Sequence, residues 1–174
     1  GVTTEHGTVG CDVLVNCAGW DEARPFLETD DAFSAKVVEI NLLGPIRVCR
    51  AVLPDMLARA WGRIINIASD AGRVGSSNES IYSAAKGGLI AFTKTIARET
   101  ARHRINVNCV CPGPTDTPLM AAVPEKVKDA LVKAIPLRRL ATPDDVAALV
   151  LWLASAANTY VTGETIGFTG GAKT

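Results

Sequence analysis

The chain has 174 residues, 48% of them hydrophobic, and its 18 basic and 18 acidic residues give a formal net charge of zero. A chain of this length can bury one hydrophobic core, and the neutral balance excludes the strongly basic surface of nucleic-acid-binding proteins. No apolar stretch is long enough to cross a bilayer and no secretory leader is recognisable. We therefore expect a cytoplasmic protein without membrane or nucleic-acid partners.

The first half of the chain predicts two strands that flank a long helix. The apolar run at 12–15 predicts a strand that ends in Asn16-Cys17-Ala18-Gly19. Asp30 is a capping residue for a helix that extends toward residue 59, and Gly44-Pro45 and Pro54 should bend or divide it. The run at 63–68 predicts a buried parallel strand, and Ser69 falls where it ends.

The second half continues the alternation of strand and helix, which predicts a single α/β domain with a parallel sheet over residues 1–174. A polar loop precedes a helix at 80–102, and a strand follows at 105–110. The segment 117–136 predicts one or two short helices, whose proline and alanine content favours a movable cover over a substrate site. Thr142-Pro143 starts another helix, and a last strand is predicted at 165–168.

The five cysteines do not form a recognisable disulfide framework or metal site. They lie in or beside apolar segments without Cys-x-x-Cys spacing: Cys11, Cys17, Cys49, Cys109 and Cys111. Only His6 and His103 could join them as metal ligands. We predict buried free thiols and no bound metal.

Polar or glycine-rich turns follow three of the predicted strands. They contain Gly19, Ser69 and Gly113. Because open α/β sheets bind ligands at the carboxyl ends of their strands, we expect these turns to meet at one ligand-binding edge.

Tyr82 and Lys86 lie one helical turn apart, thirteen residues after Ser69. Residues four apart share a helix face, so the Lys86 ammonium would favour the ionised form of the phenol, whose unperturbed pKa is about 10. A tyrosine with a lowered pKa can act as an acid–base catalyst. Pairs of this kind also arise by chance as a packed ring beside a solvated amine, so the prediction depends on the neighbouring motifs.

Taken in order, these motifs resemble those of the short-chain dehydrogenase/reductase family. They are the Asn16-Cys17-Ala18-Gly19 turn, Asn41 in the next helix, Ser69, Tyr82-x-x-x-Lys86, and the Pro112-Gly113 turn with Thr117. Their order and spacing match over essentially the whole chain. The resemblance implies a doubly wound, Rossmann-like parallel sheet that binds NAD or NADP. It also implies hydride transfer between the nicotinamide and a secondary alcohol or ketone.

The resemblance implies a role for each of four catalytic residues. Tyr82 would give its proton to the forming alkoxide or take it from the alcohol, and Ser69 would hold the substrate oxygen. Lys86 would lower the pKa of Tyr82 and hydrogen-bond the nicotinamide ribose. Asn41 would hold a water that links Lys86 to solvent. Alternatively, Asn41 satisfies backbone groups freed at the Gly44-Pro45 irregularity.

The resemblance also implies a set of cofactor-binding residues in two strand-end turns and on the tyrosine helix. They are Asn16, Ala18, Gly19, Tyr82, Lys86, Pro112, Gly113 and Thr117. Glycine at position 19 would permit close backbone approach, although an ordinary strand-to-helix turn has the same composition. Thr117 would bond the nicotinamide carboxamide. Cys17 departs from the asparagine that is common at this place in the family.

The glycine-rich loop of the family, Thr-Gly-x-x-x-Gly-x-Gly, does not occur in the chain. In a doubly wound sheet, the half of the fold that contains this loop supplies the pyrophosphate-binding helix terminus. It also supplies the residue that discriminates between NAD and NADP. We therefore expect only the C-terminal portion of the fold, as part of a longer protein or as a truncated gene product. Its sheet would expose a bare parallel edge and an uncovered face.

The sequence around Trp20-Asp21, around Ser69 and around Pro112 is similar to the sequences of dehydrogenases that act on alicyclic hydroxyacyl-CoA thioesters. More distantly, it is similar to 3-oxoacyl-acyl-carrier-protein reductases. Because guanidinium matches the geometry of phosphate, an arginine could meet the phosphates of such a carrier, although each is also an ordinary surface residue. The candidates are Arg73, Arg138 and Arg139.

Two other classes of protein compete with the enzyme. A chain that keeps the fold without its cofactor half would be a catalytically silent binding or assembly module. A serine hydrolase that uses Ser69 is disfavoured, because no Gly-x-Ser-x-Gly elbow surrounds it and neither histidine lies in a comparable turn. Family members are commonly homotetramers or dimers, which the resemblance implies would pair through the helices at 30–59 and 80–102. The small residues at 84–88 suit that contact.

Overall fold

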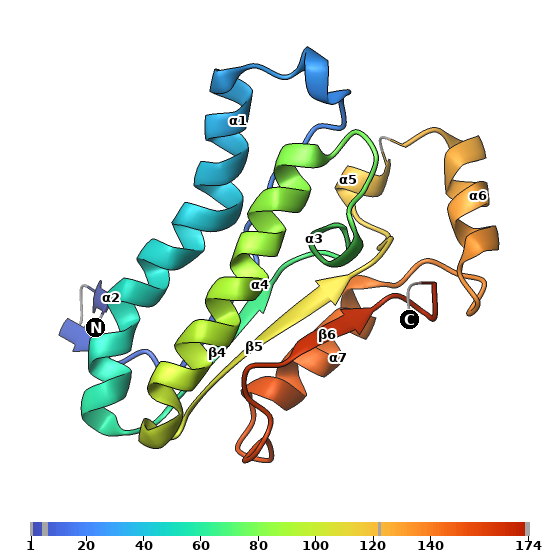
Figure 1. Cartoon of the computed structure of the whole chain (residues 1–174). Helices are drawn as coiled ribbons and strands as arrows, with labels where there is room; N and C mark the ends of the chain where they lie inside the picture. Colours follow the sequence, from blue (N-terminus) through green and yellow to red (C-terminus); the bar gives the residue numbers. More distant parts are fainter. Residues whose placement is uncertain (1, 5–6, 122, 173–174) are drawn as a thin grey trace.

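The computed structural model describes residues 2–4, 7–121 and 123–172 (Figure 1). Its centre is a parallel sheet with the strand order β3-β4-β5-β6. The strands are β3 (Val13–Asn16), β4 (Gly62–Ile67), β5 (Ile105–Pro112) and β6 (Thr165–Phe168). All four lie where the apolar runs predict them, and the α/β class with a parallel, Rossmann-like sheet is confirmed.

Two long helical segments cover one face of the sheet (Figure 1). The first consists of α1 (Asp31–Val38), a π-helical turn η2 (Glu39–Leu43) and α2 (Gly44–Arg59), and the second is α4 (Ser80–Thr100). Their apolar sides bury a cluster against the sheet that includes Met56, Ile64 and Val107, each fully buried.

The long first helix starts and changes geometry where the sequence predicts. The Asp30 carboxylate accepts a hydrogen bond from the Phe33 amide at 2.7 Å and caps α1. The predicted division before Gly44 takes the form of the π turn, whereas α2 continues without interruption through Pro54. A π turn inside a helix often marks a functional position, and this one contains Asn41.

Helix α7 (Pro143–Ala154) packs on the opposite face, where its fully buried Leu153 meets Ile65 and Val110. Thr142 caps the helix in a reciprocal arrangement with Asp145. The cover on this face does not extend over the edge strand, because Val13 and Val15 of β3 remain 39% and 40% exposed. A strand of a parallel sheet is ordinarily buried on both faces, so this is the open edge that the sequence predicts.

Shorter elements complete the described part of the chain. The predicted cover segment contains α5 (Pro118–Ala121) and α6 (Glu125–Ala134). A β-hairpin that the sequence analysis missed lies ahead of the sheet, with strands β1 (Val2–Thr4) and β2 (Gly7–Val9). Also missed were the single turns η1 (Phe26–Glu28), α3 (Ala71–Val74) and η3 (Ala101–His103).

Candidate active site

The turns after the parallel strands meet at the carboxyl edge of the sheet. The Asp70 amide, one residue after Ser69, donates to the Pro112 carbonyl at 2.9 Å. The Gly113 amide donates to the Phe168 carbonyl at 3.0 Å and ties the turn after β5 to the end of β6. The expected convergence of these turns is therefore observed.

Ser69 and Tyr82 lie side by side at this edge. Ser69 follows β4, and its hydroxyl accepts the Ala71 amide at 3.1 Å, which closes the short turn α3. Tyr82 is in the first turn of α4, and its phenol shares a hydrogen bond with the Ser69 side chain. The two hydroxyls together can bind one oxygen atom of a carbonyl or alcohol.

The pKa of Tyr82 is raised to about 12, which is opposite to the direction predicted from the Tyr82–Lys86 spacing. Burial of the phenol is the largest cause, because a desolvated ring disfavours the phenolate. The hydrogen bond to Ser69 lowers the pKa, while the negative charges of Glu79 and Asp21 raise it further. The phenol is therefore held in its protonated form.

The Lys86 side chain is buried and points toward the end of β4. Its ammonium donates to the Ile67 carbonyl at 2.9 Å and lies 5.6 Å from the centre of the Tyr82 ring. Burial lowers the pKa of Lys86 to about 8, because a desolvated amine disfavours the charged form. The amine thus belongs to the same site as the phenol, but the carbonyl is its direct partner.

Asn41 and Gly19 bring the first predicted turn to the same place. The Asn41 amide nitrogen donates to the Trp20 and Val37 carbonyls at 2.6 and 2.9 Å, and its oxygen accepts the Trp20 amide at 3.2 Å. This matches the alternative in which the asparagine satisfies backbone groups at a helix irregularity. A Cβ atom at Gly19 would lie 3.1 Å from the Asn41 oxygen and 3.5 Å from the Lys86 nitrogen.

A buried chain of hydrogen bonds, missed by the sequence analysis, links strands β3 and β4 to helix α4. The Asn16 amide donates to the Asn66 oxygen at 2.8 Å, and the Asn66 amide donates to the Thr93 hydroxyl at 2.9 Å. Thr93 in turn donates to the Leu89 carbonyl at 2.8 Å. Polar residues at inward positions of two adjacent strands were the available signal. The network holds α4 at a fixed position along the strands of the sheet. It also directs the Asn16 side chain into the core rather than toward a ligand.

The remaining predicted cofactor residues are accessible at the carboxyl edge. Ala18 and Gly19 are exposed, and Pro112, Gly113 and Thr117 are partly exposed. The Thr117 hydroxyl accepts the Met120 amide and donates to the Thr115 carbonyl, both at 3.4 Å, and so supports the start of α5.

The small residues of α4 pack inside the chain. A Cβ atom at Gly72 of α3 would come within 2.8 Å of the Gly87 nitrogen, and one at Gly88 would come within 3.1 Å of the Leu42 side chain. Ala85 is also buried. Ala84 remains exposed and Gly87 and Gly88 are partly exposed, so the pairing of subunits through residues 84–88 stays a prediction.

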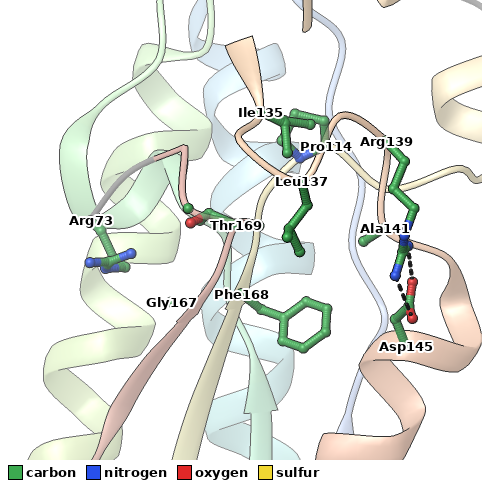
Figure 2. Close-up of a pocket in the computed structure, with 12 residues that line it drawn as sticks. Arg73, Pro114, Ile135, Leu137, Arg139, Ala141, Asp145, Gly167, Phe168 and Thr169 are labelled. Atoms are coloured by element: carbon green, nitrogen blue, oxygen red, sulfur yellow. Dashed lines mark hydrogen bonds and ion pairs between the residues drawn. The ribbon is translucent and has the colours of Figure 1, made fainter. Parts of the chain in front are cut away.

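A cavity of about 370 Å³ lies beside the end of β6 (Figure 2). Leu137 and Phe168 supply apolar walls, while the guanidinium groups of Arg73 and Arg139 line its rim. Arg73 binds Asp70 at 3.1 Å, and Arg139 forms a two-bond ion pair with Asp145. A Cβ atom at Gly167 would overlap the Arg73 guanidinium, so the arginine lies directly over this glycine of β6.

The five cysteines and His103 do not gather into one cluster in the described part of the chain. All five cysteines are free, and three of them are buried, whereas Cys17 is exposed. His103 lies in η3, after the far end of α4 from Tyr82, and His6 lies outside the described residues. Within the described ranges, no cluster of three His, Cys, Asp or Glu side chains could hold a metal ion.

The parallel sheet with helices on both faces defines a Rossmann-like protein, and comparison with known proteins identifies it as an oxidoreductase of one family. The family model described as Enoyl-(Acyl carrier protein) reductase matches residues 2–173. The chain belongs to the short-chain dehydrogenase/reductase family, as the motifs predict. Membership implies the use of a nicotinamide dinucleotide.

Several curated relatives align with nearly the whole chain. Nodulation protein G of Rhizobium sp. (strain N33) is 40% identical over 98% of this chain and 70% of its own length. Acetoacetyl-CoA reductase of Allochromatium vinosum is 37% identical, and 3-oxoacyl-acyl-carrier-protein reductase FabG of Thermotoga maritima is 38% identical. Both alignments cover 98% of this chain and 68% of the relative. The chain thus spans about two thirds of the length of these relatives. None of its described helices is long and apolar enough to cross a membrane.

Proposed function

We propose that this chain carries the catalytic half of a reductase that transfers a hydride from NADH or NADPH to a ketone, or in reverse from a secondary alcohol. The observation that carries the proposal is the hydrogen-bonded pair of Ser69 and Tyr82 with the buried Lys86 one helical turn away. The family and its reductase relatives support the same reaction class.

Ser69 and Tyr82 would act on the substrate oxygen. Both hydroxyls donate hydrogen bonds to the carbonyl oxygen, which orients it and stabilises the negative charge that develops as hydride arrives at the carbon. The Tyr82 proton then passes to the new alkoxide, which becomes the alcohol, and the phenolate regains a proton from water. A phenol held in its protonated form is suited to this donor role.

The residues at the sheet edge fit a nicotinamide dinucleotide. Ala18 and Gly19 leave the end of β3 free of large side chains, and Gly113 does the same after β5. When bound, the cofactor supplies the hydride. We assign Ala18, Gly19, Pro112, Gly113 and Thr117 to contacts with it, and Asn16 to none through its side chain, because that amide is bonded to Asn66.

Lys86 would hold the ribose of the cofactor and provide positive charge near Tyr82. Its ammonium, now bonded to the Ile67 carbonyl, retains further donors for a ligand. Asn41 would act by holding Trp20 and the π turn in place, which keeps Gly19 against the amine.

For the substrate, we propose an acyl thioester with a keto or hydroxyl group. Two reductase relatives are named for acetoacetyl-CoA and a 3-oxoacyl carrier protein. Of the three candidate phosphate-binding arginines, Arg73 and Arg139 reach the cavity beside β6, whereas Arg138 bonds the Lys133 carbonyl at 2.5 Å. Both guanidinium groups are paired with carboxylates, Arg73 with Asp70 and Arg139 with Asp145, so a carrier phosphate would share either arginine with its carboxylate.

An assay of acetoacetyl-CoA reduction by NADH or NADPH tests the proposal. The loss of absorbance of the reduced nicotinamide measures the rate. We expect activity in the parent protein, its loss in Tyr82→Phe, and parental activity in Tyr160→Phe, because Tyr160 is 97% exposed. Equal turnover of the thioester and the free acid would contradict the substrate assignment. A folded sample that binds neither cofactor would favour the silent binding or assembly module.

A further inference from the structure

An ion pair lies immediately after Ser69 and joins the carboxyl ends of three strands. Asp70 is the next residue in the chain, and its carboxylate accepts a hydrogen bond from the Arg73 guanidinium at 3.1 Å. The arginine side chain extends to β6, where its guanidinium lies directly over Gly167 (Figure 2). The Asp70 amide donates to the Pro112 carbonyl at the end of β5. The pair therefore connects the turn after β4 to both β5 and β6.

The two side chains of this pair are shielded from water more than those of any other ion pair between described residues. The Arg73 and Asp70 side chains are 27% and 11% exposed, whereas each of the other pairs includes a side chain that is 35% exposed or more. Removing the arginine alone would leave a buried carboxylate without its cation, which is costly. The aspartate would then move toward water, and the turn would move with it.

The turn that carries the serine is short and tightly bonded. The Ser69 carbonyl accepts the Gly72 amide at 3.0 Å, and the Asp70 carbonyl accepts the Arg73 amide at 2.9 Å. Gly72 also lies against the backbone of Lys86 in α4. Because Asp70 adjoins the serine, the ion pair on one side and the contact with α4 on the other together fix where the serine hydroxyl lies.

We propose that Asp70 and Arg73 are positioning residues, which hold the Ser69 hydroxyl against the Tyr82 phenol by fastening the turn after β4 to β5 and β6. Neither side chain needs to touch the substrate, because both act through Ser69. A displacement of about 1 Å in a reacting group can lower the rate roughly 100-fold, so such a fastening matters for turnover. The proposal rests on the proposed binding of the substrate oxygen by Ser69 and Tyr82.

A measurement on the protein without cofactor or substrate tests the placement of the serine. The chain has two tyrosines. In a Tyr160→Phe background, a ¹³C label at the ring Cζ therefore reports by NMR on the hydrogen bond of the Tyr82 hydroxyl alone. We expect Asp70→Asn and Arg73→Gln to move this resonance in the same direction as Ser69→Ala.

Arg59→Gln is the matched control for this measurement. It breaks a pair with Asp55 in α2, ahead of β4 and at the other edge of the sheet, and should leave the Tyr82 resonance unchanged. The proposal is overturned if the resonance also stays in place in Asp70→Asn and Arg73→Gln while circular dichroism shows that both are folded.

A double-mutant cycle on reductive turnover tests whether the two residues act as a pair. Each single variant should lower kcat by roughly 10- to 100-fold and change the KM for the cofactor by less than about twofold. Asp70→Asn/Arg73→Gln should lose less than the product of the two single losses, because it leaves no unpaired charge. Losses that multiply would show that the residues act independently, which contradicts the proposal.

Two further variants complete the test. Arg73→Lys keeps the positive charge and should recover part of the rate that Arg73→Gln loses. If a single variant fails to fold, the double variant takes its place and should still move the Tyr82 resonance. The NMR result does not depend on turnover. A resonance that moves as expected in a protein without reductase activity would therefore support this inference and contradict the proposed function, and an unmoved resonance in an active protein would do the reverse.

Discussion

Gly72 of α3 lies directly against the backbone of Lys86 in α4: a Cβ atom at position 72 would come within 2.7 Å of the Lys86 carbonyl carbon. The turn that follows Ser69 is thereby seated on the helix that carries Tyr82 and Lys86. This contact joins the serine and the tyrosine–lysine pair into one rigid unit, although no motif in the sequence points to Gly72.

We predict that Gly72→Ala destabilises the protein by about 1–3 kcal/mol, because the added methyl group meets backbone that cannot rotate away. Reductive turnover should fall as well, since the separation of Ser69 and Tyr82 must increase. Urea unfolding and initial rates measure the two effects. Ser77→Ala, at an exposed position of the loop after α3, is the control and should match the parent. Unchanged stability of Gly72→Ala would refute the contact.

Ser69→Ala should lower turnover by roughly 100- to 1000-fold, because a donor to the developing oxyanion is lost. The pKa of Tyr82 should also rise further, since the Ser69 hydrogen bond is the interaction that lowers it. Ser83→Ala is the matched control. Ser83 follows Tyr82 in α4, and its buried hydroxyl has no hydrogen-bond partner. If the steady-state rate fell by the same factor in Ser69→Ala and Ser83→Ala, a specific role for Ser69 would be ruled out.

The buried Lys86 makes the stability of the protein depend on pH. Burial lowers its pKa from 10.5 to about 8, so the unfolded chain binds the proton more tightly than the folded protein. The shift costs roughly 3 kcal/mol below pH 8, and this cost disappears as pH rises from 8 toward 10.5, where the native amine is neutral. This term therefore increases stability with pH across that window.

Comparison of the parent with Lys86→Met should isolate this term. The free energy of unfolding of the parent, measured in urea, should rise relative to that of Lys86→Met between pH 8 and pH 10. Other groups that titrate in this range, such as Cys49, remain in both proteins. Lys94→Met, an exposed lysine on the same helix, should show no such relative change. If the free energy of unfolding changed with pH in the same way in the parent and in Lys86→Met, the Lys86 amine would be solvated rather than buried.

Thr142→Ala should destabilise the protein by about 1 kcal/mol, because it removes the N-cap of α7. The Thr142 hydroxyl accepts the Asp145 amide at 3.1 Å, and the Asp145 carboxylate accepts the Thr142 amide at 2.8 Å. Thermal or urea unfolding measures the loss. Thr159→Ala removes an exposed threonine and should have little effect. Equal stability of the two variants would show that the cap contributes nothing.

The sequence by itself determined the order of the four sheet strands and the main helices, and it predicted the central site residues. The four sheet strands, the Asp30 and Thr142 caps and the Tyr82–Lys86 spacing are local patterns, each carried by a few adjacent residues. Local patterns act through short-range geometry and hydrogen bonding, which one stretch of chain contains in full.

Only the tertiary structure decided the electrostatics and packing of the site. The raised pKa of Tyr82 follows mainly from its burial, with smaller effects of Glu79 and of Asp21, which is sixty-one residues away in sequence. Asn41 bonds Trp20 from across the turn, and Gly72 lies against the backbone of Gly87. Burial and charge depend on which distant segments come together, and helical spacing alone contains neither.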